Sequence, residues 1–174
     1  MPRRFPSHRF YFAFRPDQTA SEAAMEIVSK LSLEGSPVKR ENLHVSLFPL
    51  WEGEKIQKDM IEIASTLVQA IDGKPFDFKF DTLASFAQGR RHCVVLTASH
   101  DPFEIYNLQR KFVSRFEGMV QAGNLKPHMT LFYADAPVEK RAVVPVRWQA
   151  REFLLIHSFL GQGRQEILGR WPLR

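Results

Sequence analysis

Hydrophobic and polar positions along the chain repeat with two different periods, which separates the expected strands from the expected helices. Phenylalanine takes every second position within residues 9–15, the period of a half-buried strand. Apolar residues recur at helical spacing in residues 20–31, 56–71 and 105–116, which predicts three amphipathic helices. Other apolar runs predict strands at residues 43–50, 76–86, 93–98, 127–133, 143–148, 153–160 and 167–171.

Residues that start and stop these elements support the same division. Thr19 with Glu22 three positions later resembles a capping box, and Asp101 followed by proline is typical of a helix start. The Gly-Ser-Pro sequence at residues 35–37 should end the first helix. No linker-like or low-complexity stretch interrupts the pattern, so we expect residues 1–174 to form a single domain of the α+β class.

The order of elements occurs twice along the chain. A shift of 84 positions, the separation of His44 from His128, places residues 10–15 on residues 94–99 and Asp17 on Asp101. A strand, an aspartate-initiated helix and a histidine-bearing strand therefore follow one another in both halves. Most of the intervening residues differ, so the match could arise by coincidence, but we favour a structural duplication. A duplicated unit would bring its two histidine strands together around one shared cleft.

Composition limits the class of protein. The chain has 174 residues, 44% of them hydrophobic, which suffices for a folded core. The net charge of +5 favours an anionic partner, such as a nucleotide, RNA or an acidic membrane, without choosing among them. The lone Cys93 lies in an apolar run and is expected to be buried. The basic residues 1–6 precede no apolar stretch of signal or transmembrane length, so we expect a soluble, cytoplasmic protein.

Two short motifs share the order histidine, apolar residue, hydroxyl residue, apolar residue. They begin at His44, with Ser46 as the hydroxyl, and at His128, with Thr130. In a strand, side chains two positions apart point to the same face, so each histidine should project together with its hydroxyl partner. Composition predicts such a motif roughly 0.1 times by chance. A single copy is best explained as a core histidine, but two copies at equivalent points of a repeat favour a functional site.

Phosphoryl transfer without a metal needs such a pair of residues. The attacking oxygen must lose a proton while the leaving oxygen gains one on the opposite side of phosphorus. Histidine holds either protonation state near neutral pH, so one ring can act as the base and the other as the acid. The hydroxyls of Ser46 and Thr130 can donate hydrogen bonds to the non-bridging oxygens, which carry the charge of the transition state.

Other catalytic classes lack their signatures in this sequence. There are no paired cysteines and no His-Glu-x-x-His motif, so we expect no metal site. A phosphate-binding loop, a dinucleotide fingerprint and a serine nucleophile elbow are also missing, which argues against an ATP-driven P-loop enzyme, a dinucleotide-binding enzyme and a serine hydrolase.

The two motifs resemble the signature of the two-histidine (2H) phosphoesterase superfamily. Within it, the chain is most similar to the bacterial and archaeal RNA 2′,3′-cyclic phosphodiesterases, also called 2′-5′ RNA ligases. The similar segments are residues 9–13, 40–47, 126–131 and 171–173. The resemblance implies a bilobal, duplicated α+β fold, with two antiparallel sheets flanking a central cleft, helices on the outside and no cofactor. It also implies that His44 protonates the leaving 3′-oxygen and that His128 activates water.

Several positions depart from the family pattern. Family members often continue the first motif with Phe-Leu-Gly, where this chain has Pro-Leu-Trp at residues 49–51 after Phe48. An arginine that often follows the second motif is Tyr133 here, and a tyrosine of the C-terminal hairpin is replaced by Gln165. The four motif residues are intact, so these changes concern the substrate more than the reaction.

These observations predict a phosphodiesterase that opens 2′,3′-cyclic phosphates on RNA ends or nucleotides and leaves a 2′-phosphate; a 2′-5′ RNA ligase activity stays open. No membrane association and no obligate protein partner are expected. Two alternatives are the same chemistry on a 2′-5′ oligonucleotide or a small cyclic phosphate, such as that of ADP-ribose, and an RNA-binding module without catalysis. Candidate phosphate contacts are Arg40, Lys126, Lys39, Arg90 and Arg91, and candidate base-stacking residues are Tyr11, Phe48, Tyr133 and Trp51.

Overall fold

A computed structural model describes residues 7–122 and 125–174 of the chain. Its strands are β1 (His8–Phe14), β2 (Gly35–Pro37), β3 (Val45–Gly53), β4 (Phe76–Gln88), β5 (Arg91–Thr97), β6 (Met129–Ala134), β7 (Arg141–Ala150), β8 (Glu152–Phe159) and β9 (Arg164–Pro172). Its helices are α1 (Gln18–Ser29), α2 (Lys58–Leu67) and α3 (Phe103–Arg115), with short 3₁₀ turns at Arg40–Asn42 and Val68–Ala70. The mixed α/β architecture agrees with the class predicted from the sequence.

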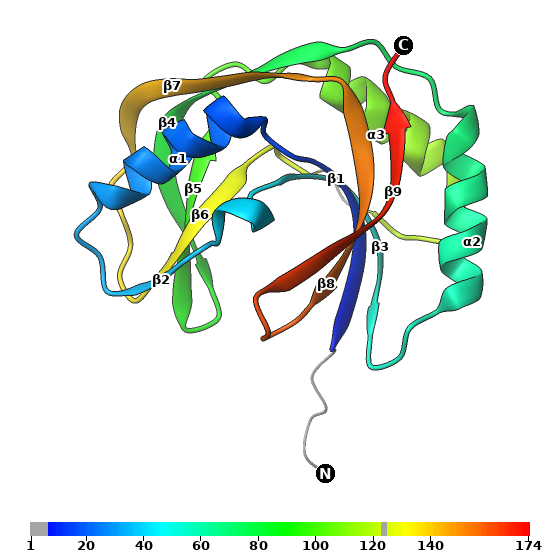
Figure 1. Cartoon of the computed structure of the whole chain (residues 1–174), viewed down its shortest axis with the longest axis horizontal. Coiled ribbons are helices and arrows are strands. Elements are labelled where there is room, and N and C mark those ends of the chain that lie inside the picture. The colour runs from blue at the N-terminus through cyan, green and yellow to red at the C-terminus, as the bar shows by residue number, and fades with distance from the viewer. Residues whose placement is uncertain (1–6, 123–124) are drawn as a thin grey trace.

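The described strands form one antiparallel sheet of nine strands, not the two separate sheets that we expected. The order is β7-β4-β5-β6-β3-β1-β8-β9, and β2 lies beside β6. β3 and β6 pair only through Val45 and Met129. The sheet therefore has two halves that share a single residue pair and then diverge, with β4 to β7 on the left and β1, β3, β8 and β9 on the right in Figure 1.

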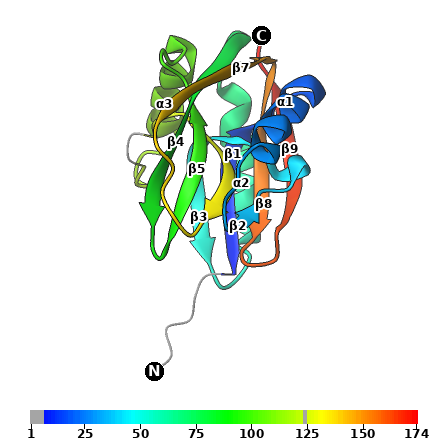
Figure 2. The same cartoon turned by 90° about the vertical axis from the view of Figure 1, so that its left-hand side faces the viewer.

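The helices cross from one half of the sheet to the other. α1 follows β1 along the chain but packs against β6 and β7, whereas α3 follows β5 and packs against β3. The two helices consequently lie on opposite sides of the molecule (Figure 1, Figure 2). None of the helices within the described ranges is long and apolar enough to cross a membrane.

The core is rich in phenylalanine, as the alternation in β1 predicted. Phe10, Phe12 and Phe14 are buried on one face of β1, and Phe12 packs against Phe112 of α3 with ring centroids 4.9 Å apart. Tyr11, on the opposite face, is also only 6% exposed, because it packs with a smaller apolar group from β8. β1 is therefore buried on both faces and forms the centre of its half of the sheet.

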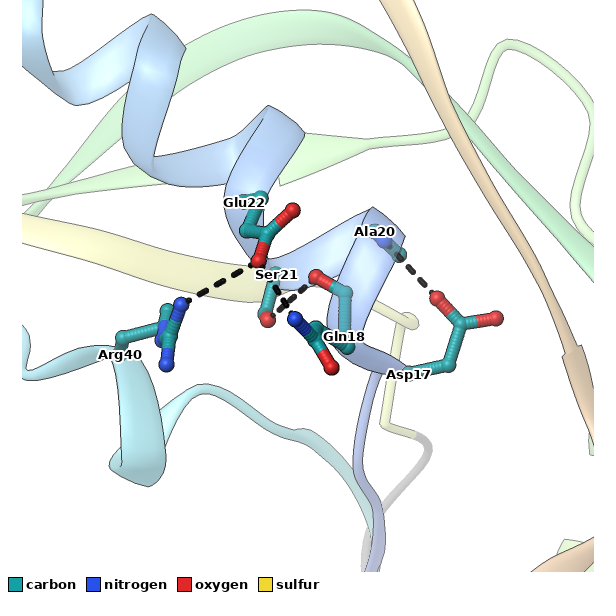
Figure 3. A network of polar contacts seen from close by, with 6 residues as sticks. All are labelled: Asp17, Gln18, Ala20, Ser21, Glu22 and Arg40. Carbon is teal, nitrogen blue, oxygen red and sulfur yellow. Dashed lines mark hydrogen bonds and ion pairs between the residues drawn. The ribbon is translucent and has the colours of Figure 1, made fainter.

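Three local expectations needed correction. Asp17, and not Thr19, caps α1: its carboxylate accepts a hydrogen bond of 2.8 Å from the backbone N–H of Ala20 (Figure 3). Asp101 does not cap α3, because its carboxylate accepts the hydroxyl of Tyr106 at 2.6 Å instead. Residues 35–37, expected only to end a helix, form β2 as well. A side chain at Gly35 would meet the backbone of β6 at 2.1 Å, so this close approach requires glycine.

Strand register reveals the internal duplication more clearly than the sequence does. In the first half Phe12 pairs with Phe48 and Ala13 with Ser46, so residue 47 forms a bulge. In the second half Val94 pairs with Phe132 and Val95 with Thr130, so residue 131 forms an equivalent bulge. The histidine strands are thus related by the predicted 84 positions. Their neighbours β1 and β5 are related by 82, because Ala13 corresponds to Val95.

Candidate functional site

A cavity of about 350 Å³ lies at the junction of the two halves of the sheet. His44 and Ser46 line it from the start of β3, and His128 and Thr130 line it from the start of β6. The remaining lining residues are Arg9, Tyr11, Pro49, Phe86, Gln88, Cys93, Leu125, Tyr133, Ser158, Leu160 and Gln165. The two motifs, far apart in the sequence, therefore share one cavity of a size typical of small-molecule sites.

The bulges decide which side chains face this cavity. In a regular strand Ser46 and Phe48 would share a face, but the bulge at residue 47 turns Phe48 to the core. Phe48 is 1% exposed and packs against Phe112 and Phe116, with ring centroids 5.3 and 5.2 Å away. The expectation that Phe48 stacks on a nucleobase is therefore wrong. Trp51 also packs towards the core, against Phe10, and does not line the cavity.

Both motif histidines are held by the same backbone contact. The Nδ1 of His44 lies 2.8 Å from the carbonyl oxygen of Asn42, and the Nδ1 of His128 lies 2.9 Å from that of Lys126. A carbonyl only accepts, so Nδ1 is the donor in each ring. This contact fixes the neutral tautomer and leaves Nε2 as the nitrogen that can exchange a proton with a ligand in the cavity.

The environment of His44 favours its neutral form. Burial is the main reason that the pKa of His44 falls from 6.5 to about 4; the nearby charges of Arg15, His128 and Arg9 act in the same direction, and the hydrogen bond to Asn42 opposes them. In the free protein His44 is therefore neutral at pH 7. This is the state that a general base needs, whereas an acid would need a higher pKa.

Aromatic rings flank both histidines. Tyr11 lies beside His44 with ring centroids 5.0 Å apart, and burial raises the pKa of the Tyr11 hydroxyl. Phe86 meets His128 edge-on at 5.6 Å and remains 44% exposed, while Tyr133 is 38% exposed. The sequence nominated Tyr11 and Tyr133 but missed Phe86, because the alternating phenylalanines before it mark a strand and give no sign of where the buried part ends.

The predicted cationic contacts are not in the cavity wall. Arg40 reaches α1, where its guanidinium lies 3.5 Å from the carboxylate of Glu22 (Figure 3). Lys126 is exposed, and its contribution to the site is the backbone carbonyl that holds His128. Lys39, Arg90 and Arg91 are likewise not among the residues that line the cavity.

Two arginines that the sequence did not single out are close to the site. Arg9 lines the cavity and forms an ion pair of 2.5 Å with Glu52. Arg15 lies behind the wall, where its Nη2 donates a hydrogen bond of 3.0 Å to the side-chain oxygen of Gln165. Both arginines lie in or next to β1. The alternation of phenylalanine with other residues predicted this strand, but it did not indicate which face of the strand lies towards the cavity.

Cys93 is buried, as predicted, with 2% of its surface exposed. Its thiol donates a hydrogen bond to the side-chain oxygen of Gln88, and burial raises the pKa of the thiol. Within residues 7–122 and 125–174, no group of three or more His, Cys, Asp or Glu side chains is placed to hold a metal ion.

Comparisons with known proteins place this geometry in a known fold. The family model of the 2′-5′ RNA ligase superfamily matches residues 15–158. A crystal structure described as a phosphoesterase is 24% identical, with a TM-score of 0.79 over 95% of this chain and 98% of that chain. Escherichia coli LigT complexed with phosphate is also 24% identical, with a TM-score of 0.77 over 98% and 99% of the two chains. TT0787 of Thermus thermophilus is 20% identical, with a TM-score of 0.79 over 95% and 98%. No curated protein sequence matches the chain.

Proposed function

The chain belongs to the 2′-5′ RNA ligase superfamily, and from this premise we propose that it is a metal-independent phosphodiesterase acting on 2′,3′-cyclic phosphates of RNA ends or nucleotides. The product is a 2′-phosphate. The observation that carries the proposal is the shared cavity, in which His44 and His128 are held by the same Nδ1 contact and each stands with a hydroxyl residue.

The reaction needs one proton to leave water and one to reach the ribose. The Nε2 of His128 takes a proton from water as the water oxygen bonds to phosphorus, and the Nε2 of His44 gives a proton to the 3′-oxygen as its bond to phosphorus breaks. After the step His128 carries the proton taken from water, and His44 is neutral because its own proton is now on the 3′-oxygen; proton exchange with solvent restores both rings. Ser46 and Thr130 donate hydrogen bonds to the non-bridging oxygens, whose charge grows in the transition state.

The low pKa of His44 is compatible with its role as the acid once an anion is bound. In the free protein its pKa of about 4 keeps the ring neutral. A phosphate oxygen next to Nε2 stabilises the protonated ring and raises its pKa. Substrate binding thereby protonates His44, which later transfers this proton to the 3′-oxygen. In the free protein the ring is neutral, so no positive charge is buried on it.

A nucleotide substrate is supported by the exposed aromatic rings of the cavity. Phe86 and Tyr133 line the cavity and leave 44% and 38% of their surfaces to solvent, so a nucleobase beside the phosphate has rings on which to stack. E. coli LigT, which shares the fold, forms complexes with phosphate and with 3′-AMP. Nucleotide binding by that protein is the reason to test nucleotides first.

The test is a panel of substrates assayed with EDTA present. We expect turnover of 2′,3′-cyclic nucleotides, with a 2′-phosphate product identified by ³¹P NMR. The panel also contains a 2′-5′ dinucleotide, the cyclic phosphate of ADP-ribose and a 2′,3′-cyclic phosphate on an RNA oligonucleotide. Faster turnover of the 2′-5′ dinucleotide or of the ADP-ribose cyclic phosphate would assign the alternative substrate, and faster turnover of the RNA oligonucleotide would assign RNA ends over free nucleotides. RNA binding without any turnover would favour the non-catalytic module. Activity lost with EDTA and restored by a divalent ion would refute the mechanism.

Variants of the two histidines test the same proposal. His44→Ala and His128→Ala should each lower kcat about 10²–10⁴-fold, the usual contribution of a positioned acid or base. The double variant should lose much less than the product of the two losses, because the rings act as a unit. His100→Ala is the matched control, since His100 is exposed and does not line the cavity.

A further inference from the structure

Gln165 has an amide whose orientation is determined by a neighbour outside the cavity. It lies at the start of β9, opposite Ser158 of β8, and its side chain lines the cavity. Its Oε1 accepts the hydrogen bond of 3.0 Å from Nη2 of Arg15. An arginine side chain only donates, so the oxygen of the amide must face Arg15. The Nε2 group, with its two N–H bonds, therefore occupies the other branch of the amide.

The Nε2 group of Gln165 is available to a ligand. Among the residues that the structure describes, no acceptor within hydrogen-bond distance is recorded for it. The side chain of Gln165 therefore presents a hydrogen-bond donor to the cavity, while its acceptor oxygen is occupied by Arg15. Donors of this type suit an oxygen of a phosphate, which accepts hydrogen bonds and never donates them when ionised.

Arg15 is placed to hold the amide and not to touch a ligand itself. It is absent from the cavity wall, its Nε is buried without a hydrogen-bond partner, and burial lowers the pKa of its guanidinium. No carboxylate of the described residues lies within ion-pair distance of it. Its positive charge nevertheless reaches the site: it opposes the larger effect of burial, which raises the pKa of Tyr11, and it adds to the effect of burial, which lowers the pKa of His44. An unpaired cation behind a cavity favours an anion inside it.

We propose that Gln165 is a phosphate-binding residue, and that Arg15 is a positioning residue that turns the N–H bonds of Gln165 towards the phosphate. The proposal rests on the proposed function for the identity of the substrate, but not for the binding of phosphate itself. It also gives a role to the position where the chain departs from its family, since the amide supplies a donor of fixed direction.

Gln165→Glu tests the donor. Glutamate keeps the acceptor for Arg15 but replaces the N–H bonds with an oxygen that repels phosphate. We expect the Kd for inorganic phosphate and the KM for a 2′,3′-cyclic nucleotide to rise about tenfold or more, the effect of losing one charge-assisted hydrogen bond. kcat should change less than KM, because the contact exists in the ground state too. Gln162→Glu makes the same charge change in the exposed turn of the same hairpin and should change both values less than about twofold.

Arg15 is tested by coupling. Gln165→Leu and Arg15→Met should each weaken phosphate binding several-fold, and the double variant should be no weaker than the poorer single variant, because both changes remove the same oriented donor. Arg15→Lys keeps the charge and one donor and should restore part of the affinity. If Arg15→Met does not fold by circular dichroism, Arg15→Lys combined with Gln165→Leu supplies the same comparison.

The outcomes distinguish the role of Gln165, the role of Arg15 and the proposed function from one another. Phosphate binding by Gln165→Glu at the level of Gln162→Glu would overturn the role of Gln165. Independent, additive losses from Arg15 and Gln165 would overturn the positioning role of Arg15. If the unaltered protein binds phosphate through Gln165 but cleaves none of the cyclic phosphates, this inference stands and the proposed function fails.

Discussion

The protonation of His44 can be perturbed without mutation, by filling the cavity with sulfate. Sulfate keeps its charge across the whole pH range of a histidine titration and resembles phosphate in shape, so it adds negative charge beside His44 and does not itself titrate. In the free protein the pKa of His44 lies near 4, against an ordinary value of 6.5, chiefly because the ring is buried. With sulfate bound, the pKa should move back towards neutrality.

The size of the shift follows from the electrostatics of the site. Lowering a pKa from 6.5 to about 4 corresponds to about 3 kcal/mol against the charged ring, at about 1.4 kcal/mol per pH unit. A single negative charge about 4 Å from Nε2 contributes about 4 kcal/mol at an effective dielectric constant of about 20. One bound anion therefore offsets the burial, and the pKa should rise by about 2–3 units. The protonated fraction at pH 7 would rise from about one in a thousand to a sizeable share.

Long-range ¹H–¹⁵N spectra of the imidazole rings, recorded against pH with and without sulfate, measure this directly. They report the tautomer as well, and the neutral ring should carry its proton on Nδ1, which donates to Asn42. His100 is the internal reference, and chloride at equal ionic strength is the control for screening. A free His44 that titrates near 6.5, the ordinary value, would refute the effect of burial. A normal shift without sulfate dependence would show that the anion does not bind beside this ring.

Three further predictions concern other parts of the molecule. Phe86→Leu should raise KM for cyclic nucleotides several-fold but leave the Kd for inorganic phosphate unchanged, because the ring is expected to stack on the base; equal effects on both ligands would contradict stacking. Thr130→Ala should lower kcat about tenfold or more while Thr130→Ser keeps most of it, and similar losses in both would show that the methyl group matters more than the hydroxyl. Burial lowers the pKa of His157, which contacts His8 at 2.9 Å, so the folded protein loses stability relative to the unfolded chain as the pH falls below about 6.5. His157→Phe should reduce this pH dependence in urea titrations, and an unchanged slope would show that His157 is not its source.

Most of the secondary structure was predictable from the sequence because the apolar residues of the longer elements recur with the period of a strand or of a helix. The phenylalanine alternation identified β1, and helical spacing identified α1, α2 and α3 to within a few residues. β2 was missed, because its three residues are all exposed and its partner strand is far away in the sequence. The single continuous sheet was missed as well, because one residue pair between β3 and β6 joins its halves, and no periodicity encodes such a contact.

The candidate site was predictable in its motifs and not in its surroundings. The repeated pattern indicated His44 and His128, since each motif lies within four consecutive residues and can be recognised without knowing the tertiary structure. Phe48 was assigned to the wrong face because the i, i+2 rule assumes a regular strand, and the bulge at residue 47 breaks that rule. Gln165 was noticed only as a departure from the family, and its link to Arg15 depends on the order β1-β8-β9 in the sheet.

The strand register also explains how two equivalent histidines can differ. His44 and His128 occupy matching positions and make matching contacts, but an in-line displacement needs them in opposite protonation states. One difference between their surroundings comes from the first strand of each repeat, which is offset by 82 positions and not by 84. By that register the counterpart of Arg15 is the uncharged Thr97. The half that contains His44 therefore has an arginine behind the cavity wall where the other half has a threonine. The charge of this arginine adds to burial, the main cause, in lowering the pKa of His44 in the free protein, so His44 can act as the acid only after a bound anion has raised its pKa.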